Sequence, residues 1–399
     1  MTVQRLIAIT AIVGCTAFGW FILGTAVTFR SASSDSRLSP EVVKNWGPVL
    51  TQEHPAIYYE SPTAARSRRE IQPERSDIHV KLTYEPKQKG LLWYRTYFAD
   101  FKAEYLIKNP APITQTIYVG FRFPAADARY DQFSLKLGDK LTDKTPVDGE
   151  LRESLQLAPG AEMPLIITYR AAGMNAWTYA LKSAKRLKNL HLTMETDFRE
   201  INIPAGAESP TEPRKLNDRG WLLEWKYVDV IGANAIAMDM PSVTNPGTVA
   251  GRMTFFAPVS LLLFFAVLVI VAIRLGINLH PMNYFFLAAG CFAFQLLFAY
   301  LVDLLPLLTS FLIAAAVSLT LVNGYLWRAA GRVFALVSAT AQLTYMVLFS
   351  YSFFFEGLTG ITITIGAVAT LALLMAFTAR VNWNIAFGSR TTPPPMPVR

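Results

Sequence analysis

The chain has 399 residues, of which 52% are hydrophobic and only 17% are charged, and its formal net charge is +8. Typical soluble domains carry about 25% charged residues, so this composition excludes an ordinary soluble protein. Acidic residues are unevenly spread, because only Asp303 and Glu356 are acidic from Met253 onward. The composition therefore predicts one part in a membrane and one part in water.

The first long apolar segment, Leu6 to Val27, follows Arg5 and contains no charged residue. A cleaved signal peptide has an apolar stretch of about 7–15 residues, so this longer segment predicts an uncleaved anchor helix within residues 1–28. Ile12 to Cys15 also resembles a lipoprotein cleavage box. The residues after Cys15 stay apolar, which favours the anchor over the lipoprotein.

Residues 29–252 form the predicted water-exposed domain. Residues 29–76 are polar, contain proline and an arginine-rich stretch, and indicate a solvated loop. From Asp77 onward apolar residues alternate with polar ones, which is typical of half-buried strands. The two cysteines, Cys15 and Cys291, lie in apolar runs, so no disulfide is expected in this domain. Many short strands separated by turn signals predict an all-β, sandwich-like domain. The expected strands are Ile78–Tyr84, Tyr97–Tyr105, Ile113–Phe123, Phe133–Leu137, Pro164–Tyr169, Trp177–Leu181, Leu190–Met194, Leu222–Val230 and Ala235–Met240.

The last third of the chain contains five further apolar segments. A bilayer core requires about 20 apolar residues per helix, so each segment predicts one membrane span. With the anchor they make a six-span helical bundle, of which residues 253–379 form five helices and residues 380–399 a cytoplasmic tail. The segments are Phe255–Ile273, Tyr284–Val302, Leu304–Leu326, Val333–Ser350 and Leu358–Ala379.

Charge at the helix ends predicts the orientation. Positive residues are enriched in short cytoplasmic loops, whereas Asp303 and Glu356 fall at the opposite ends. Both termini are therefore expected in the cytoplasm of a bacterial cell, and the large domain in the periplasm. The bases at the cytoplasmic helix ends, next to the lipid bilayer, account for most of the net positive charge, so no nucleic-acid partner is expected. The arginines of the cytoplasmic ends are Arg5, Arg274, Arg328, Arg332, Arg380, Arg390 and Arg399.

Signatures of catalysis are missing from the sequence. The four histidines, His54, His79, His191 and His280, are not spaced as metal ligands, and there is no P-loop, nucleophile elbow or dinucleotide fingerprint. We therefore expect no metal, no cofactor and no enzyme activity. Three amide side chains lie within the spans, and we expect them to form hydrogen bonds between helices rather than a substrate path. They are Gln295, Asn323 and Gln342.

The helical part carries short recognisable motifs. His280-Pro281-Met282-Asn283-Tyr284 opens the third helix, an apolar run then leads to Asp303, and Thr378 to Trp383 closes the last helix. These motifs, together with Asn45 to Leu50, resemble the CreD family of bacterial inner membrane proteins. The resemblance implies a role in cell-envelope integrity or stress response, with no known catalysis. It also marks His280 and Tyr284, one helical turn apart, as candidate interaction residues, alongside a simpler interpretation as a helix start with an interfacial aromatic residue.

Three functional hypotheses remain open on the sequence. The first is a non-enzymatic envelope protein whose β-domain binds a periplasmic protein or envelope polymer. The second is a membrane subunit that handles lipid or another substrate beside a cytoplasmic ATPase. The third is an envelope enzyme with a carboxylate site in the outer domain. Asp303 and Glu356 are further candidate interaction residues, either docking onto bases within Lys182 to Lys188 or serving as solvated caps.

Overall fold

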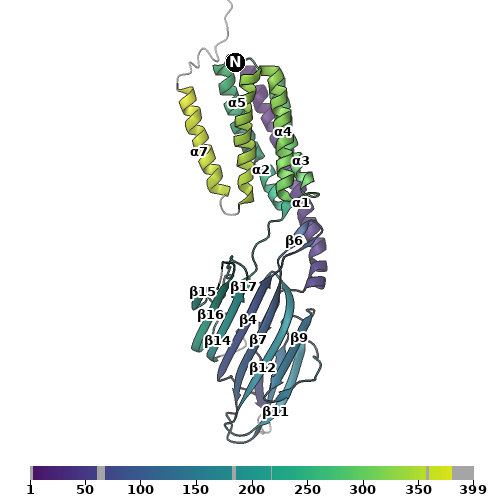
Figure 1. Ribbon diagram of the computed structural model, residues 1–399, viewed down its shortest axis with the longest axis vertical. Helices are drawn as coiled ribbons and strands as arrows, with labels where there is room; N and C mark the ends of the chain where they lie inside the picture. Colours follow the sequence, from purple (N-terminus) through teal and green to yellow (C-terminus); the bar gives the residue numbers. More distant parts are fainter. Residues whose placement is uncertain (1–2, 61–67, 182–185, 217, 356–358, 380–399) are drawn as a thin grey trace, which may run out of the picture. The chain divides into compact units, whose positions relative to one another are not determined.

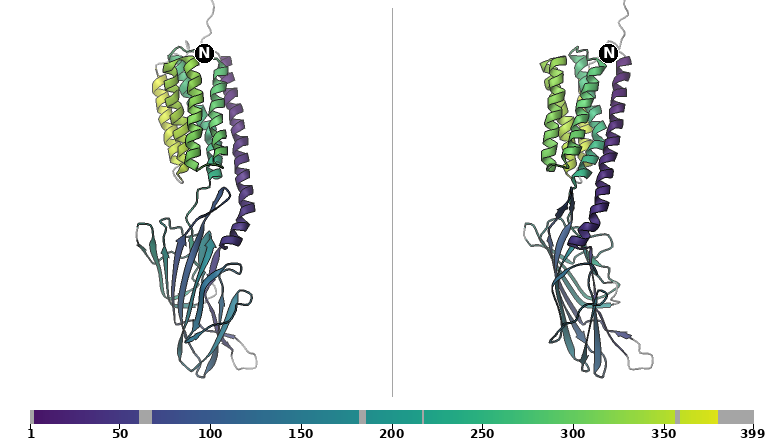
Figure 2. Two further views of the ribbon diagram at one scale, coloured as in Figure 1. Left: turned by 45° about the vertical axis from the view of Figure 1, so that its right-hand side comes forward. Right: turned by 90° about the vertical axis from the view of Figure 1, so that its right-hand side faces the viewer.

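The computed structural model describes residues 3–60, 68–181, 186–216, 218–355 and 359–379. The chain divides into two compact units, a helical unit of residues 1–34 and 244–399 and a β-rich unit of residues 35–243. Each unit has a hydrophobic core of its own. Figure 1 labels many of the elements of both units, and Figure 2 shows them from two further directions.

The helical unit contains long helices separated by short turns. The expected division between Tyr284–Val302 and Leu304–Leu326 is confirmed, because one helix ends at Leu301 and the next begins at Leu307. The elements are α1 (Val3–Trp46), which continues into the β-rich unit, α2 (Pro246–Arg274), α3 (Pro281–Leu301), α4 (Leu307–Ala330), α5 (Arg332–Gln342), the π-helical η1 (Leu343–Leu348), α6 (Phe349–Tyr351), the 3-10 helical η2 (Ser352–Phe354) and α7 (Thr359–Thr378).

Within the described ranges, five helices are long and apolar enough to cross a membrane. The sixth expected span corresponds to α7, whose apolar stretch at 360–376 is shorter than the other five. Many large apolar side chains on these helices face outward, including Leu262, Leu312 and Leu336, which are 57%, 57% and 69% exposed. Such a surface is unusual for a soluble protein and is typical of contact with lipid.

The β-rich unit is made of strands joined by turns and short loops. The nine strands expected from Ile78 to Met240 are confirmed with shifted ends, and five further strands in this stretch were not expected. The strands are β1 (Leu50–Glu53), β2 (Ala56–Glu60), β3 (Arg68–Glu70), β4 (Arg75–Tyr84), β5 (Lys87–Lys89), β6 (Leu92–Tyr94), β7 (Thr96–Lys108), β8 (Gln115–Arg122), β9 (Tyr130–Leu137), β10 (Lys140–Leu141), β11 (Glu150–Leu157), β12 (Glu162–Met174), β13 (Ala176–Ala180), β14 (Arg186–Thr196), β15 (Glu212–Lys215), β16 (Trp221–Ile231) and β17 (Ile236–Asp239).

One large sheet dominates this unit (Figure 1). Its eight strands follow the order β10-β9-β12-β7-β4-β14-β16-β15. Two smaller sheets have the orders β11-β8-β2-β3 and β1-β13-β17, and β5 and β6 form a two-stranded ribbon. Most pairs are antiparallel, but β14 pairs in parallel with β4, and β1 with β13.

One face of the large sheet and residues of the two smaller sheets share a single core. The alternation expected along β7 is confirmed, because Tyr97, Phe101 and Tyr105 are buried whereas Lys102 is exposed. Val119 of β8 joins the same core from the smaller sheet. Each large apolar side chain buried in this way contributes about 1.5–3 kcal/mol, so the unit is stabilised without a disulfide.

The solvated loop expected over residues 29–76 is wrong for most of that segment. Helix α1 extends to Trp46, and strands β1, β2 and β3 follow it. Leu38, Val42 and Trp46 recur every fourth residue, and this stripe packs against Leu92 and its neighbours. The alternation expected for β8 also fails at its start, because Ile113 is 52% exposed.

Gly47 ends the first helix. Its φ angle is +101°, a conformation that side-chain-bearing residues rarely adopt, and a Cβ atom there would approach the carbonyl oxygen of Ala172 to 2.2 Å. The chain can therefore turn from α1 into β1 only with glycine at this position.

Candidate functional site

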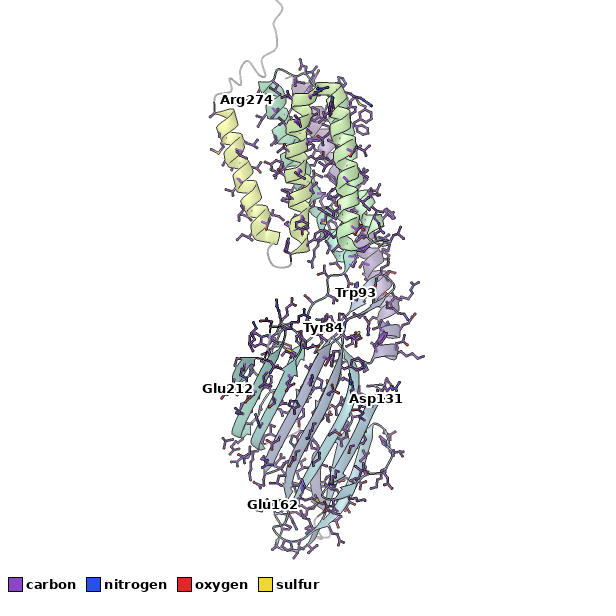
Figure 3. All side chains as sticks on the ribbon, in the orientation of Figure 1. Tyr84, Trp93, Asp131, Glu162, Glu212 and Arg274 are labelled. Atoms are coloured by element: carbon purple, nitrogen blue, oxygen red, sulfur yellow. The ribbon has the colours of Figure 1, made fainter. Side chains whose placement is uncertain are left out.

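The outer face of the large sheet, opposite the core, carries polar and charged side chains. Strand register aligns these side chains in rows that cross the sheet. Figure 3 labels Glu212 on β15 and Asp131 on β9 toward opposite edges of this sheet. One row contains Glu104, Asp77, His191 and Lys226, and the next contains Lys102, His79, Thr193 and Glu224.

A shallow hollow of about 300 Å³ opens in the middle of this outer face, across β7, β4 and β14. Thr193 has a short side chain, so the surface is low where it lies beside His79. The imidazoles of His79 and His191 are 46% and 42% exposed, and a ligand in the hollow could reach both. The lining residues are Asp77, Ile78, His79, Lys102, Glu104, His191 and Thr193.

Carboxylates surround the two imidazoles. His191 Nδ1 lies 3.9 Å from Asp77 Oδ1, and His191 Nε2 lies 3.6 Å from Glu224 Oε2. His79 Nε2 lies 3.7 Å from Glu195 Oε1. A hydrogen bond from Lys226 lowers the pKa of the Glu224 carboxyl. The hollow therefore places hydrogen-bond donors and acceptors of both charge signs within a few ångströms of one another.

Nothing in the described part of the chain brings together three side chains of His, Cys, Asp or Glu that could hold a metal ion. A pocket with imidazole, ammonium, hydroxyl and carboxylate groups can instead bind a polar organic ligand through several hydrogen bonds.

A pair of facing carboxylates would favour the enzyme hypothesis, and Asp77 and Glu104 lie directly opposite each other in register. Arg75 is shared between them, with its Nε 2.7 Å from Asp77 and its terminal nitrogen 3.7 Å from Glu104. A general acid and base require two carboxylates in different environments. We interpret this pair as an ion cluster because one guanidinium contacts both members.

A second polar cluster is buried inside the β-rich unit around His54, which is 6% exposed. The His54 ring packs edge-on against Tyr105 and Tyr179, and its Nδ1 donates to the carbonyl of Pro55 at 3.2 Å. Its Nε2 has no hydrogen-bond partner among the residues that the structure describes. Burial lowers the pKa of His54 to about 4. The cluster is part of the core of the β-rich unit.

The hydrogen bonds expected between the apolar helices are confirmed. Gln342 of α5 donates to Ser318 Oγ of α4 at 3.0 Å and accepts from Asn323 at 2.9 Å. Ser318 in turn donates to a backbone carbonyl of α3 at 2.7 Å. Gln295 of α3 lies 3.5 Å from Ser350 Oγ of α6. These amides link neighbouring helices of the helical unit.

Asp303 follows α3 and pairs with Arg30 of α1. The two groups are 2.8 Å apart, and Arg30 also donates to the carbonyl of Ala299 and lies over the Tyr300 ring. The side chains of Arg30 and Asp303 are 40% and 22% exposed. The pair joins two helices of the same unit. Glu356 lies outside the described residues.

The bases with which Asp303 was expected to form ion pairs have other partners, which lie within the β-rich unit. Arg186 pairs with Asp229, and Lys188 lies 3.1 Å from Glu74. Residues 182–185 are outside the described ranges. Asp303, Arg186 and Lys188 therefore each pair with a residue of their own unit.

His280 and Tyr284 have separate roles at the start of α3. His280 is the N-cap, and its Nδ1 accepts from the backbone N–H of Met282 at 3.2 Å. Pro281 occupies the first helical position, as expected. Tyr284 is 3% exposed and packs edge-on against Phe265 of α2. These contacts account for the motif as a helix start.

Sequence reasoning did not identify the hollow. It placed His79 and His191 in separate strands, but it had no means of showing that β4 and β14 are neighbours. The only available signal was that both histidines stand on the polar face of an alternating strand.

No protein-family model matches the chain, and no curated protein matches it in sequence. Among solved structures, the chain is similar to a crystal structure of a candidate nutrient-binding protein from Legionella pneumophila, with 9% sequence identity and a TM-score of 0.31. The similarity covers 67% of this chain and 99% of that chain.

Proposed function

We propose that the chain is a non-enzymatic membrane protein of the bacterial cell envelope, whose β-rich unit binds an envelope component on the outer face of its large sheet. The observation that carries this proposal is the hollow of about 300 Å³ around His79 and His191. It lies on strands of the large sheet, and strands hold binding groups more accurately than loops do.

The proposal includes placement in the inner membrane with six spans, both termini in the cytoplasm and the β-rich unit in the periplasm. The apolar helices support it, and so does the distribution of charge. Arg274 and Arg328 stand in the last turns of α2 and α4, whereas Asp303 follows α3. Helix α7 would be the sixth span, tilted little because its apolar stretch is short.

A CreD-like role in envelope integrity or stress response belongs to the same proposal. Its support is the sequence resemblance, in particular the segment from His280 to Tyr284 that opens α3. Such a role requires a protein that senses or holds an envelope component and does not require catalysis.

The chemistry of the hollow favours a glycan polymer that carries charged peptides. Such a polymer presents hydroxyl, amide, carboxylate and ammonium groups together. Lys102 and the two imidazoles can bind its carboxylates, while Asp77 and Glu104 can bind its ammonium groups. A partner protein would have to match the same mixed charges, and it would be an alternative outcome of the test below.

The test measures binding of soluble peptidoglycan fragments to the full chain in lipid nanodiscs by calorimetry. Replacing both imidazoles, as His79→Ala with His191→Ala, should weaken binding at least tenfold, since each lost hydrogen bond contributes about 1 kcal/mol. Lys136→Ala is the matched control, because Lys136 is on the same face but outside the hollow. Equal affinities for all three proteins would refute the site.

Topology has its own test. Alkaline phosphatase fused after Pro241 should be active, because that position would be periplasmic. The same enzyme fused after Arg399 should be inactive. The reverse result would show that the orientation is wrong, irrespective of what the hollow binds.

A further inference from the structure

An apolar groove of about 450 Å³ lies in the helical unit, between α2, α5 with η1, and α7. Its walls are aliphatic, with Val267 and Val271 from α2, Val337 from α5, and Leu374 from α7. Arg274, the last residue of α2, is the only charged side chain among the lining residues of the described structure. A volume of this size is within the range of small-molecule binding sites, about 300–1,000 Å³.

The groove follows from how α7 packs. Helix α7 is held near its middle by a hydrogen bond of 3.0 Å from Thr370 Oγ1 to Tyr345 Oη of η1. Beyond this contact, toward Arg274, the helices line the groove with aliphatic side chains of modest size. Figure 3 shows Arg274 at the same end of the helical unit as the C-terminal end of α7.

The hydroxyl groups that line the groove already form hydrogen bonds within the protein. Thr340 Oγ1 donates to the carbonyl of Leu336, Thr344 Oγ1 donates to the carbonyl of Thr340, and Tyr345 accepts from Thr370. A peptide segment in the groove would leave its own backbone N–H and C=O groups without partners, which costs several kcal/mol per group in hydrocarbon. A hydrocarbon chain requires no such partners.

The positive charge of Arg274 favours apolar ligands that carry an anionic head group over those that carry none. A guanidinium binds phosphate and carboxylate groups through paired hydrogen bonds. It stands at one end of the groove, so a ligand with an anionic head and an apolar tail matches both the charge and the wall chemistry. At the end of a membrane helix, this position also corresponds to the depth of lipid headgroups.

We infer that the groove is a specific site for an anionic phospholipid, with one acyl chain between α2, α5 and α7 and the headgroup phosphate at Arg274. The inference rests on the proposed membrane placement, but it is independent of the ligand of the β-rich unit. It adds a lipid-binding site to the helical unit.

The experiment uses native mass spectrometry of the delipidated full chain in detergent, titrated with phosphatidylglycerol or phosphatidylcholine. Arg274→Gln removes the charge, and Val337→Trp fills the groove. Arg328→Gln is the matched control, because this arginine stands in the last turn of α4 and does not line the groove. Inorganic phosphate, added in a separate arm, distinguishes headgroup binding from free anion binding.

The wild-type chain and Arg328→Gln should retain phosphatidylglycerol at least tenfold better than phosphatidylcholine. Arg274→Gln should lose this preference, and Val337→Trp should lose retention of both lipids. Equal retention of phosphatidylglycerol by all four proteins would overturn the inference, as would displacement of the lipid by inorganic phosphate alone. Loss in Val337→Trp with unchanged preference in Arg274→Gln would overturn the headgroup assignment. None of these outcomes depends on peptidoglycan binding.

Discussion

Acid should destabilise the β-rich unit through His54. This side chain is buried, its Nδ1 is engaged with the carbonyl of Pro55, and its Nε2 has no acceptor nearby within the described structure. A proton added at Nε2 would create a buried charge without a partner. The pKa of His54 is accordingly lowered from 6.5 to about 4.

The sign and size of the effect follow from this shift. The unfolded chain binds a proton at His54 below about pH 6.5, whereas the folded chain does not until about pH 4. Stability is therefore full above pH 6.5 and is lost as the pH falls toward 4. A shift of this size corresponds to about 3 kcal/mol in total, of which about 2 kcal/mol is lost by pH 5.

The assay is chemical unfolding of the full chain in detergent, followed by tryptophan fluorescence at several values between pH 7.5 and 5. Most Asp and Glu side chains stay charged in this range, so histidines dominate the change. His54→Leu should change stability by less than about 1 kcal/mol at pH 7.5 and should remove most of the loss at pH 5. His191→Leu, at an exposed position, is the control. Equal losses in the wild type and His54→Leu would refute the reasoning.

Three further predictions concern stability. Trp225 is fully buried, so Trp225→Ala should lower the free energy of unfolding by about 3–5 kcal/mol in the same assay, and a loss below about 1 kcal/mol would contradict its place in the core. A fragment of residues 35–243 should be soluble with a β-type circular dichroism spectrum, whereas a fragment of residues 77–245 lacks β1, β2 and β3 and should not fold. Asp303→Asn and Arg30→Gln should each change the free energy of unfolding by about 0–1 kcal/mol, because the pair is partly exposed. A coupling energy above about 2 kcal/mol in a double-mutant cycle would show that the pair is more buried than the structure indicates.

Periodicity was sufficient to predict the long strands of the large sheet that alternate clearly, such as β4, β7 and β12, and the apolar helices. Along β7 the burial alternates at each residue from Tyr97 to Tyr105, and this period of two is visible in the sequence because one face is core and the other is water. The short break after Asp303 was equally visible, since one uninterrupted helix would be too long for a bilayer.

The extension of α1 and the strands that follow it were harder to predict. The stripe of Leu38, Val42 and Trp46 is interrupted by charged residues and by Pro40, which usually ends a helix. Strands β1 and β2 have only 4 and 5 residues, too few for a clear period. Strand β1 pairs with the distant β13, and β2 pairs with the distant β8 as well as with β3. Tertiary pairing therefore determines their structure more than local sequence does.

The hollow could not be predicted for the same reason, but its position follows from the core. Strand β4 pairs in parallel with β14 in a register that sets Ile78 beside Leu192 and Val80 beside Met194 on the buried face. Side chains alternate between faces, so this register also sets His79 beside Thr193 on the outer face. A slip of one residue along one strand would turn that strand's histidine into the core, where an unpaired imidazole is unfavourable. The apolar residues that hold β4 against β14 therefore also determine which polar groups meet in the hollow.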